Sequence, residues 1–462
     1  MVNNKRRRGA AAAGSCSESD DDDRDKSLNS GSESDSDSDD EALTKRGDYD
    51  NINDIKDMED ILFLQRGAMD IRMDRWDHGR INWDAHVAQL EHEDKFVNEY
   101  TMSVRAHGNL VRILDPILKR KQYNSRCSEP IQVEHITAIG LRCLQGGRPK
   151  DMRHIMGTST SAAYDALDDF IDAVICAPEL DIHLPQTEAD WRQVNQGFTR
   201  KSSNQIIAGC CGALDGFFQR TNKPPKARVG NVVSYYSGHY ESYGVNCQAC
   251  IQSDLQFMYF GVVSPGSTND NISYPMASAL KEAFETLPLG LYGLADAAYT
   301  LNENMLIPFT GVQRLDPAHD AFNYYLSQLR IRVEMAFGRL VNKFRILNGK
   351  IEGSLDRVTA ILTACARLHN FIIQQDGPFE VLDSDVVPHA NAPLGMGYLP
   401  VVPDETFEAY DGVSHTREGI VEYLRDYGIE RPLHNIERKK REESMVLSTG
   451  GLEIDREFIS PI

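Results

Sequence analysis

The sequence predicts a protein of the mixed α/β (α+β) class, whose main domain is preceded by a helical N-terminal region. Three observations carry this prediction. Hydrophobic residues make up 41% of the 462 positions, enough for a sizeable core. Apolar residues recur with a helical period up to about residue 200, and short, strand-like apolar runs begin near residue 206. From there strands alternate with helices, which is typical of α/β and α+β domains.

Residues 1–47 are predicted to form a disordered, acidic and serine-rich tail. Acidic residues and serines dominate from 18 to 41, and such a segment has too little apolar surface to fold. The basic run at 5–8 (KRRR) is a candidate nuclear localisation signal, with an ordinary solvated tail as the alternative.

Charge and composition exclude several classes of protein. The formal net charge is −20, so any contact with DNA must come from local basic patches. No run of about 18 apolar residues predicts a membrane span, and the N-terminus lacks the apolar core of a secretory signal. The nine cysteines have no regular spacing and suit a reducing compartment.

Residues 48–130 are predicted to form a helical region of two or three helices, with no chemistry visible in them. Its apolar residues recur at mixed helical spacings. The residues that define the pattern are Trp83, Val87, Leu90, Phe96, Tyr100, Leu110, Ile113, Leu114 and Ile117.

Residues 131–200 are predicted to form a helix-turn-helix-like domain. An apolar-periodic helix spans 133–144, Pro149 opens a short helix, and Gly157 ends it. Thr158 or Ser159 then caps a longer helix, which completes the outline of a helix-turn-helix. An ordinary helical bundle is the alternative. The second helix carries acids that oppose close approach to phosphates, namely Asp165, Asp168 and Asp169.

Residues 201–376 are predicted to form the main domain. A buried strand is expected at 206–215, ending in Asp215, and another at 291–295, directly before Asp296. The remaining elements are a hairpin over 243–253 and 256–263 and helices at 274–286, 320–344 and 355–374. Residues 377–462 are expected to be an acidic, loosely ordered tail, with one helical segment near 416–427 and a second basic cluster at 438–441.

Three acids stand out by their context. Asp215 and Asp296 follow apolar strands, and Glu334 lies within a long helix. A carboxylate beside a buried strand is costly unless it is paired or holds a metal ion. Converging carboxylates suit Mg²⁺ or Mn²⁺, and two such ions promote phosphoryl transfer. In the alternative interpretation each acid caps a turn or pairs with a nearby arginine, as Glu334 would with Arg330.

Five motifs together resemble the core of the PIF/Harbinger transposases. They occur in the order of that family: 212–216 (GALDG), 264–270 (SPGSTND), 294–299 (LADAAY), 332–347 (RVEMAFGRL to FRIL) and 365–371 (CARLHNF). The resemblance covers roughly residues 130–375. Two departures are Asn269, where the family often has His, and a loop at 230–244 that is rich in Tyr and Ser.

The resemblance implies a DDE endonuclease on a ribonuclease-H-like fold, a mixed sheet flanked by helices. Asp215, Asp296 and Glu334 would be its metal-binding catalytic triad, with Mg²⁺ or Mn²⁺ as cofactor. Asp270 matches a further acid at the metal site, with a turn residue as the alternative. The implied function is a DNA endonuclease or transposase. The alternatives are a catalytically silent, transposase-derived protein that binds DNA or chromatin or acts as a scaffold and, ranked last, a phosphohydrolase that acts on small molecules.

Two groups of basic residues are the candidate DNA contacts. Lys223, Lys226 and Arg228 follow Asp215 closely. A second group forms one stripe on the long helix at 100° per residue, with a solvated face as the alternative: Arg332, Arg339 and Lys343.

Two features are discounted as sites. Cys247 and Cys250 form a lone CxxC on a strand, where they point to opposite faces. His369 lies in a mostly apolar helix and is expected to be a core histidine.

The resemblance also bears on partners and compartment. DNA is the implied substrate, and Harbinger-type elements usually encode a separate Myb-like protein, so a Myb/SANT-like DNA-binding partner is expected. The sequence does not decide whether the chain forms a homo-oligomer. No membrane association is expected, and the nucleus is the expected compartment, with the cytoplasm as a second location.

Overall fold

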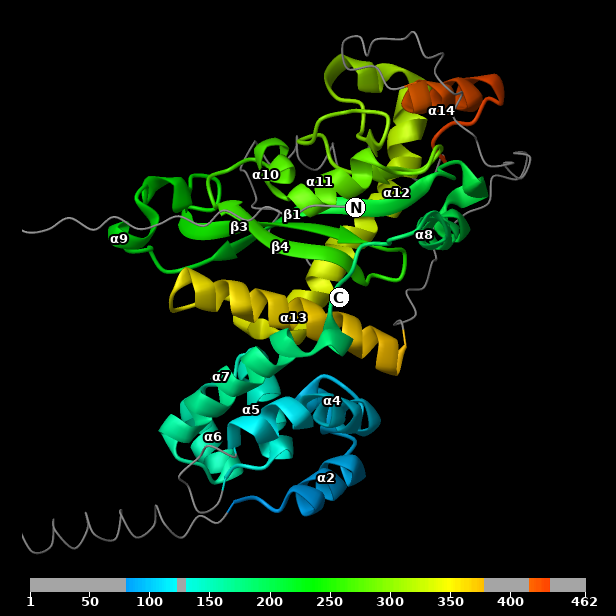
Figure 1. Ribbon diagram of the computed structural model, residues 1–462. Coiled ribbons are helices and arrows are strands. Elements are labelled where there is room, and N and C mark those ends of the chain that lie inside the picture. Colours follow the sequence, from blue (N-terminus) through cyan, green and yellow to red (C-terminus); the bar gives the residue numbers. More distant parts are fainter. Residues whose placement is uncertain (1–79, 123–129, 378–414, 433–462) are drawn as a thin grey trace, which may run out of the picture. The chain divides into compact units, whose positions relative to one another are not determined.

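The computed structural model in Figure 1 describes residues 80–122, 130–377 and 415–432. All the described residues belong to one compact unit, which begins at His78. The predictions for the acidic tail and for the basic clusters at 5–8 and 438–441 lie outside the described residues. None of the described helices is both long and apolar enough to span a membrane.

The first described segment, residues 80–122, is helical, as predicted. Its helices are α2 (Trp83–His92), α3 (Phe96–Tyr100) and α4 (Val104–Gln122). The ring of Trp83 packs against His107 of α4 at a centroid distance of 5.0 Å and against Tyr100 at 5.7 Å. These aromatic contacts join the three helices into one small core.

The next three helices begin and end close to the predicted residues. They are α5 (Val133–Leu144), α6 (Pro149–Met156) and α7 (Thr160–Cys176). Gly157 adopts a left-handed conformation with φ of +64°, and the Ser159 hydroxyl accepts a hydrogen bond from the Ala162 N–H. Helix α5 approaches α7 closely because Gly140 has no side chain: a Cβ there would lie 2.1 Å from Phe170 Cδ1. DNA binding by the α6–α7 pair stays a prediction.

The main domain contains a mixed sheet. Its strands are β1 (Cys210–Arg220), β2 (Tyr236–Ser237), β3 (Ser242–Ile251), β4 (Phe257–Pro265), β5 (Tyr292–Leu294) and β6 (Met305–Leu306). The order is β4-β3-β1-β5-β6, and β2 pairs with the start of β3. Strands β3 and β4 are antiparallel to their neighbours, whereas β5 and β6 run parallel to β1. This mixed sheet is consistent with the expected ribonuclease-H-like fold.

The position of Asp215 corrects one expectation. The strand was expected to end at Asp215, but β1 continues to Arg220 and stays paired with β3 as far as Gly244. It continues because Phe217, beyond the acid, packs against Phe337 at a ring distance of 5.2 Å. Only the parallel pairing with β5 ends early, at Ala213.

Both faces of the sheet are covered. Long helices α12 (Pro317–Lys343) and α13 (Leu355–Asp376) pack on one face, and in Figure 1 α13 runs between the sheet and α7. Helix α11 (Ser278–Glu285) contributes Leu280 and Phe284 to a second core on the other face. Helix α8 (Glu188–Lys201) packs beside β1 and contributes to both cores. Cys247 belongs to the first core and Cys250 to the second, so the CxxC cysteines face opposite ways, as predicted.

One predicted helix is two helices in the structure. The helix expected at 274–286 is divided into α10 (Asp270–Met276) and α11, with the break at Ala277. Pro275 lies inside α10, two residues before the break, where it removes one helical hydrogen bond and its ring crowds the preceding turn.

The C-terminal helical segment forms as predicted. Helix α14 (His415–Asp426) lies beside α12 in Figure 1. Two ion pairs join this segment to the start of α12: Arg425 to Asp316 at 3.2 Å, and Arg431 to Asp320 at 3.0 Å.

Two buried histidines predict a loss of stability in mild acid. Burial lowers the pKa of His107 and of His369 to about 4, and the His369 Nε2 lies 2.9 Å from the Leu255 carbonyl oxygen, as expected for a core histidine. The unfolded chain therefore binds more protons between about pH 6.5 and pH 4, so stability falls as the pH decreases through this window. Each histidine contributes up to about 3 kcal/mol to this loss.

Urea unfolding at pH 7.5 and pH 5 measures this contribution. We expect His107→Phe to reduce the pH dependence of the free energy of unfolding, because the variant lacks the titrating group. An identical pH dependence in the wild type and the variant would contradict the assignment.

Candidate active site

Asp215 lies in the middle of β1 with its carboxylate largely buried. Its side chain is 18% exposed, Oδ1 accepts a hydrogen bond of 2.8 Å from the Gly216 N–H, and Oδ2 lies 3.5 Å from Arg330 Nη1. Burial raises the pKa of Asp215 to about 7, helped by the carboxylates of Asp296 and Asp270 and opposed by Arg330 and the Gly216 N–H. Several negative groups are therefore crowded at this point.

Arg330 joins Asp215 to the acid of the long helix. Its Nη2 lies 2.5 Å from Glu334 Oε1, one turn further along α12. The helix places both side chains on one face, because residues four apart are neighbours. The ion pair that formed the alternative interpretation of Glu334 is thus present, and the same guanidinium also contacts Asp215.

Asp296 comes two residues after the end of β5. Because β5 runs parallel to β1 and Leu294 pairs with Ala213, Asp215 and Asp296 each follow this pair by two residues, and the neighbouring strands bring the two acids close together. The Asp296 Oδ1 accepts a hydrogen bond of 2.9 Å from the Ala298 N–H, which holds the turn after the strand.

Asp270 occupies the first turn of α10 and has partners of its own. Its Oδ1 accepts hydrogen bonds from Asn246 at 3.2 Å and from Gln248 at 3.0 Å. Burial raises its pKa, and the two amides lower it. The carboxylate packs so closely on Gly216 that a Cβ there would lie 2.2 Å from Asp270 Oδ1. Since consecutive strand residues point to opposite faces, Asp270 approaches β1 from the face opposite to the Asp215 side chain.

Three residues of this site were not predicted to belong to it: Gly216, Gln248 and Tyr299. Arg330 was predicted only as the ion-pair partner in the alternative interpretation of Glu334. The Tyr299 hydroxyl donates a 2.6 Å hydrogen bond to the buried Gln248 Oε1, and Gln248 in turn donates to Asp270. Tyr299 belongs to the LADAAY motif and Gly216 to GALDG, so both had a signal in the sequence. Gln248 also had a signal in the sequence: it lies in the middle of an apolar strand, and a buried amide needs a hydrogen-bond partner.

The donor chemistry suits a hard divalent cation. Carboxylate oxygens are the ligands that Mg²⁺ and Mn²⁺ prefer, and a bound cation would offset the burial and the carboxylate repulsion that together raise the pKa of Asp215. Within the residues that the structure describes, no three His, Cys, Asp or Glu side chains gather into a formed metal site. The guanidinium of Arg330 supplies positive charge between Asp215 and Glu334 instead.

The two groups of predicted DNA-binding residues lie in different surroundings. Lys223, Lys226 and Arg228 are exposed on and before the short helix α9 (Lys226–Val229). The stripe on α12 faces the protein instead: Arg332 is 5% exposed and hydrogen-bonds the Ser253 carbonyl, and Lys343 Nζ donates to the Thr101 carbonyl at 3.1 Å.

Arg339, the third member of the stripe, is also partly buried. Burial lowers the pKa of Arg339 and that of Lys343. Helical periodicity had aligned the three cations correctly, but α12 packs this face against the β3–β4 turn and the N-terminal helices. Neither a DNA contact by Arg332 nor a solvated basic face fits this burial.

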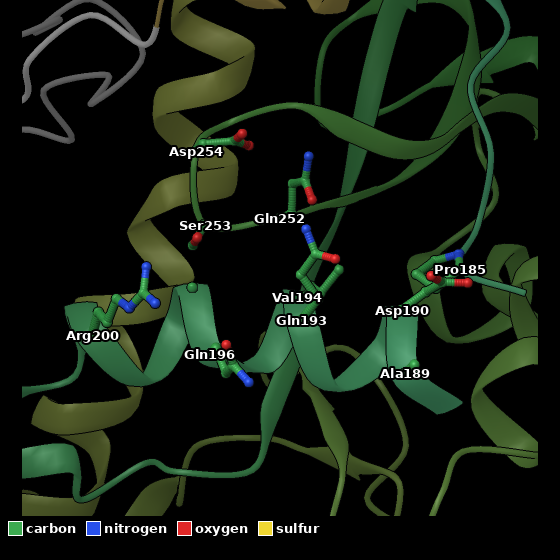
Figure 2. A pocket seen from close by; sticks show the side chains of 11 residues that line it. Pro185, Ala189, Asp190, Gln193, Val194, Gln196, Arg200, Gln252, Ser253 and Asp254 are labelled. Atoms are coloured by element: carbon green, nitrogen blue, oxygen red, sulfur yellow. The ribbon is translucent and has the colours of Figure 1, made fainter. Parts of the chain in front are cut away.

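A cavity of about 720 Å³ lies elsewhere, between α8 and the β3–β4 turn. Figure 2 shows Gln196 and Arg200 of α8 on one side and Ser253 and Asp254 of the turn on the other. The helix approaches the turn closely at Gly197, where a Cβ would lie 2.3 Å from Ser253 Oγ. None of the candidate catalytic acids lines this cavity.

Comparison with known families supports a nuclease-like domain at the carboxylates. Residues 214–370 match the family model described as DDE superfamily endonuclease, and this range contains all four candidate acids. The matched range is less than half of the chain and supports a transposase-derived nuclease domain. No characterised protein and no solved structure matches the chain.

Proposed function

We propose that the chain is a divalent-metal-dependent DNA endonuclease or transposase of the Harbinger type. One observation carries the proposal: Asp215 of β1 and Glu334 of α12 contact one guanidinium, at 3.5 Å and 2.5 Å, beside the carboxylate of Asp296. Residues far apart in the sequence therefore bring a cation and three acids together. The match to the DDE superfamily endonucleases supports the same chemistry.

In this proposal Asp215, Asp296 and Glu334 hold Mg²⁺ or Mn²⁺. A bound divalent ion would activate water or a DNA 3′ hydroxyl and stabilise the leaving oxygen of the phosphodiester. We assign Asp270 a positioning role, because its carboxylate already accepts hydrogen bonds from Asn246 and Gln248 and packs against β1 at Gly216. Its role as a fourth metal ligand remains the sequence-based hypothesis.

Cleavage of supercoiled plasmid by the purified full chain tests this proposal. We expect nicking with Mg²⁺ or Mn²⁺ and none with EDTA. Glu334→Gln should remove the activity, whereas Glu282→Gln should not, because Glu282 is an exposed acid of α11 away from the site. Cutting that persists in EDTA, or in Glu334→Gln, would contradict the proposal.

A second function is favoured by one specific observation. Arg330 already neutralises Asp215 and Glu334, as expected in a transposase-derived protein that binds DNA or chromatin, or serves as a scaffold, without cutting. A folded wild type that binds DNA but neither cuts plasmid nor binds Mn²⁺ would favour this function.

We also propose that the protein acts in the nucleus on DNA, with a Myb/SANT-like partner. Fluorescent fusions that lack the basic clusters at 5–8 and 438–441 test the compartment, and retention in the nucleus without either cluster would contradict their role as signals. Light scattering of the purified chain decides whether it forms a homo-oligomer, and pull-down with a purified Myb/SANT domain tests the partner.

A further inference from the structure

A row of one cation and two tyrosines crosses the sheet beyond the end of β1. We call Lys223, Tyr236 and Tyr243 the tyrosine face. Tyr236 of β2 pairs directly with Tyr243 of β3, so both side chains lie on the same side of the sheet. Their rings meet edge to face at 5.3 Å, and Lys223 Nζ lies 5.8 Å from the centre of the Tyr243 ring. Tyr236 is 41% exposed, so its ring is accessible to a ligand.

The segment that carries this row is held to the sheet. Tyr240 stacks on Phe218 of β1, with ring centres 4.3 Å apart and planes 10° apart. Phe218 in turn lies against Gly244 and Gly266, where a Cβ would come within 2.3 Å and 2.6 Å of its ring. The exposed Tyr236 is therefore presented by an anchored segment.

The local charge is opposite to that of the whole chain. Between residues 218 and 244 four basic side chains accompany a single acid, Glu241, although the chain carries a net charge of −20. The basic residues are all exposed: Arg220, Lys223, Lys226 and Arg228. Cations interleaved with exposed aromatic rings are typical of surfaces that bind single-stranded nucleic acid, where the cations contact phosphates and the rings stack on bases.

We infer that the tyrosine face binds unpaired bases of the DNA strand next to the phosphodiester that is cut. This inference rests on the proposed nuclease function and names the form of its substrate. Bases inside a duplex are already stacked on one another, so a tyrosine ring stacks on the face of a base most readily where the strand is unpaired. From Asp215 to the level of Tyr243 the strand rises about 20 Å, at about 3.3 Å per residue. A strand whose bases stay stacked at about 3.4 Å covers this distance with about six nucleotides, and a more extended strand covers it with fewer.

Fluorescence anisotropy with the full chain in EDTA tests the inference without cleavage. The probes are one labelled duplex with blunt ends and the same duplex with a single-stranded overhang of about six nucleotides. Tyr236→Ala should weaken binding to the overhang probe by about tenfold, since stacking of one base is worth about 1–3 kcal/mol. Binding to the blunt duplex should stay unchanged, and Tyr236→Phe should retain the wild-type affinity.

Tyr427→Ala is the matched control, because Tyr427 is 57% exposed directly after α14 and lies outside both the tyrosine face and the α6–α7 pair. It should leave both affinities unchanged. Equal affinities of the wild type and a folded Tyr236→Ala for the overhang probe, or equal weakening for both probes, would overturn the inference. If the wild type still cleaves plasmid, such a binding result overturns the inference and leaves the nuclease proposal standing. If Tyr236→Ala loses affinity for the overhang probe alone and the wild type does not cleave plasmid, the tyrosine face is supported as a binding surface and the nuclease proposal is overturned.

Discussion

Asp215→Asn is expected to lower the rate of metal-dependent plasmid cleavage by about a thousandfold or more. The substitution keeps the size of the side chain and replaces a negatively charged oxygen ligand with a neutral amide. Asp215 carries the largest expected effect because it lies at the centre of the site: its pKa is affected by Arg330, Asp296 and Asp270 together.

The fold of this variant should remain intact. The carboxylate of Asp215 is largely buried and its pKa is raised to about 7, so its charged form is poorly stabilised by the fold. A neutral amide avoids that burial of charge. Circular dichroism and thermal unfolding serve as the control, with Glu282→Gln as the matched acid elsewhere. Cleavage within about tenfold of the wild-type rate, a barrier difference of about 1.4 kcal/mol, would contradict a catalytic role for Asp215.

Arg330→Met is expected to lower the free energy of unfolding by about 2 kcal/mol in metal-free buffer. The variant leaves the carboxylates of Asp215 and Glu334 without their shared cation. A fully buried pair would lose more, but the side chains of Arg330 and Glu334 are 23% and 49% exposed, so solvent screens part of the loss.

Mn²⁺ should restore more stability to Arg330→Met than to the wild type, because a divalent ion no longer competes with the guanidinium. Urea unfolding with EDTA and with Mn²⁺ measures both effects. Arg314→Met, at an exposed arginine of the η4 segment (Gly311–Leu315), is the control. A variant as stable as the wild type without metal, and equally insensitive to Mn²⁺, would show that Arg330 does not stand at a cation site.

Much of the fold is predictable because its elements carry local signals. The hairpin of β3 and β4, the strand β5 and the helices α5, α6, α7, α12 and α13 all lie close to the expected residues. Their ends are set by Gly157, by Pro149 and by capping side chains such as Ser159, which act over a few residues. The continuation of β1 past Asp215 was missed because it depends on Phe217 packing against a distant helix.

The candidate site is predictable in its acids but not in its contacts. Motif order singled out Asp215, Asp296 and Glu334, whereas the shared guanidinium of Arg330 requires β1 and α12 to be packed together. The burial of Arg332 had no signal in its own helix, since periodicity shows which residues share a face but not what covers it. The contact of Asp270 with Gly216 likewise depends on α10 packing on the sheet against β3 and β4.

Titration of the full chain with Mn²⁺ by calorimetry tests the metal-binding carboxylate centre most directly. The comparison is between the wild type and the double variant Asp215→Asn, Asp296→Asn, with Glu282→Gln as control. We expect saturable binding to the wild type and the control, and its loss in the double variant. Equal binding by all three proteins, or none by a folded wild type, would contradict a metal centre at Asp215, Asp296 and Glu334.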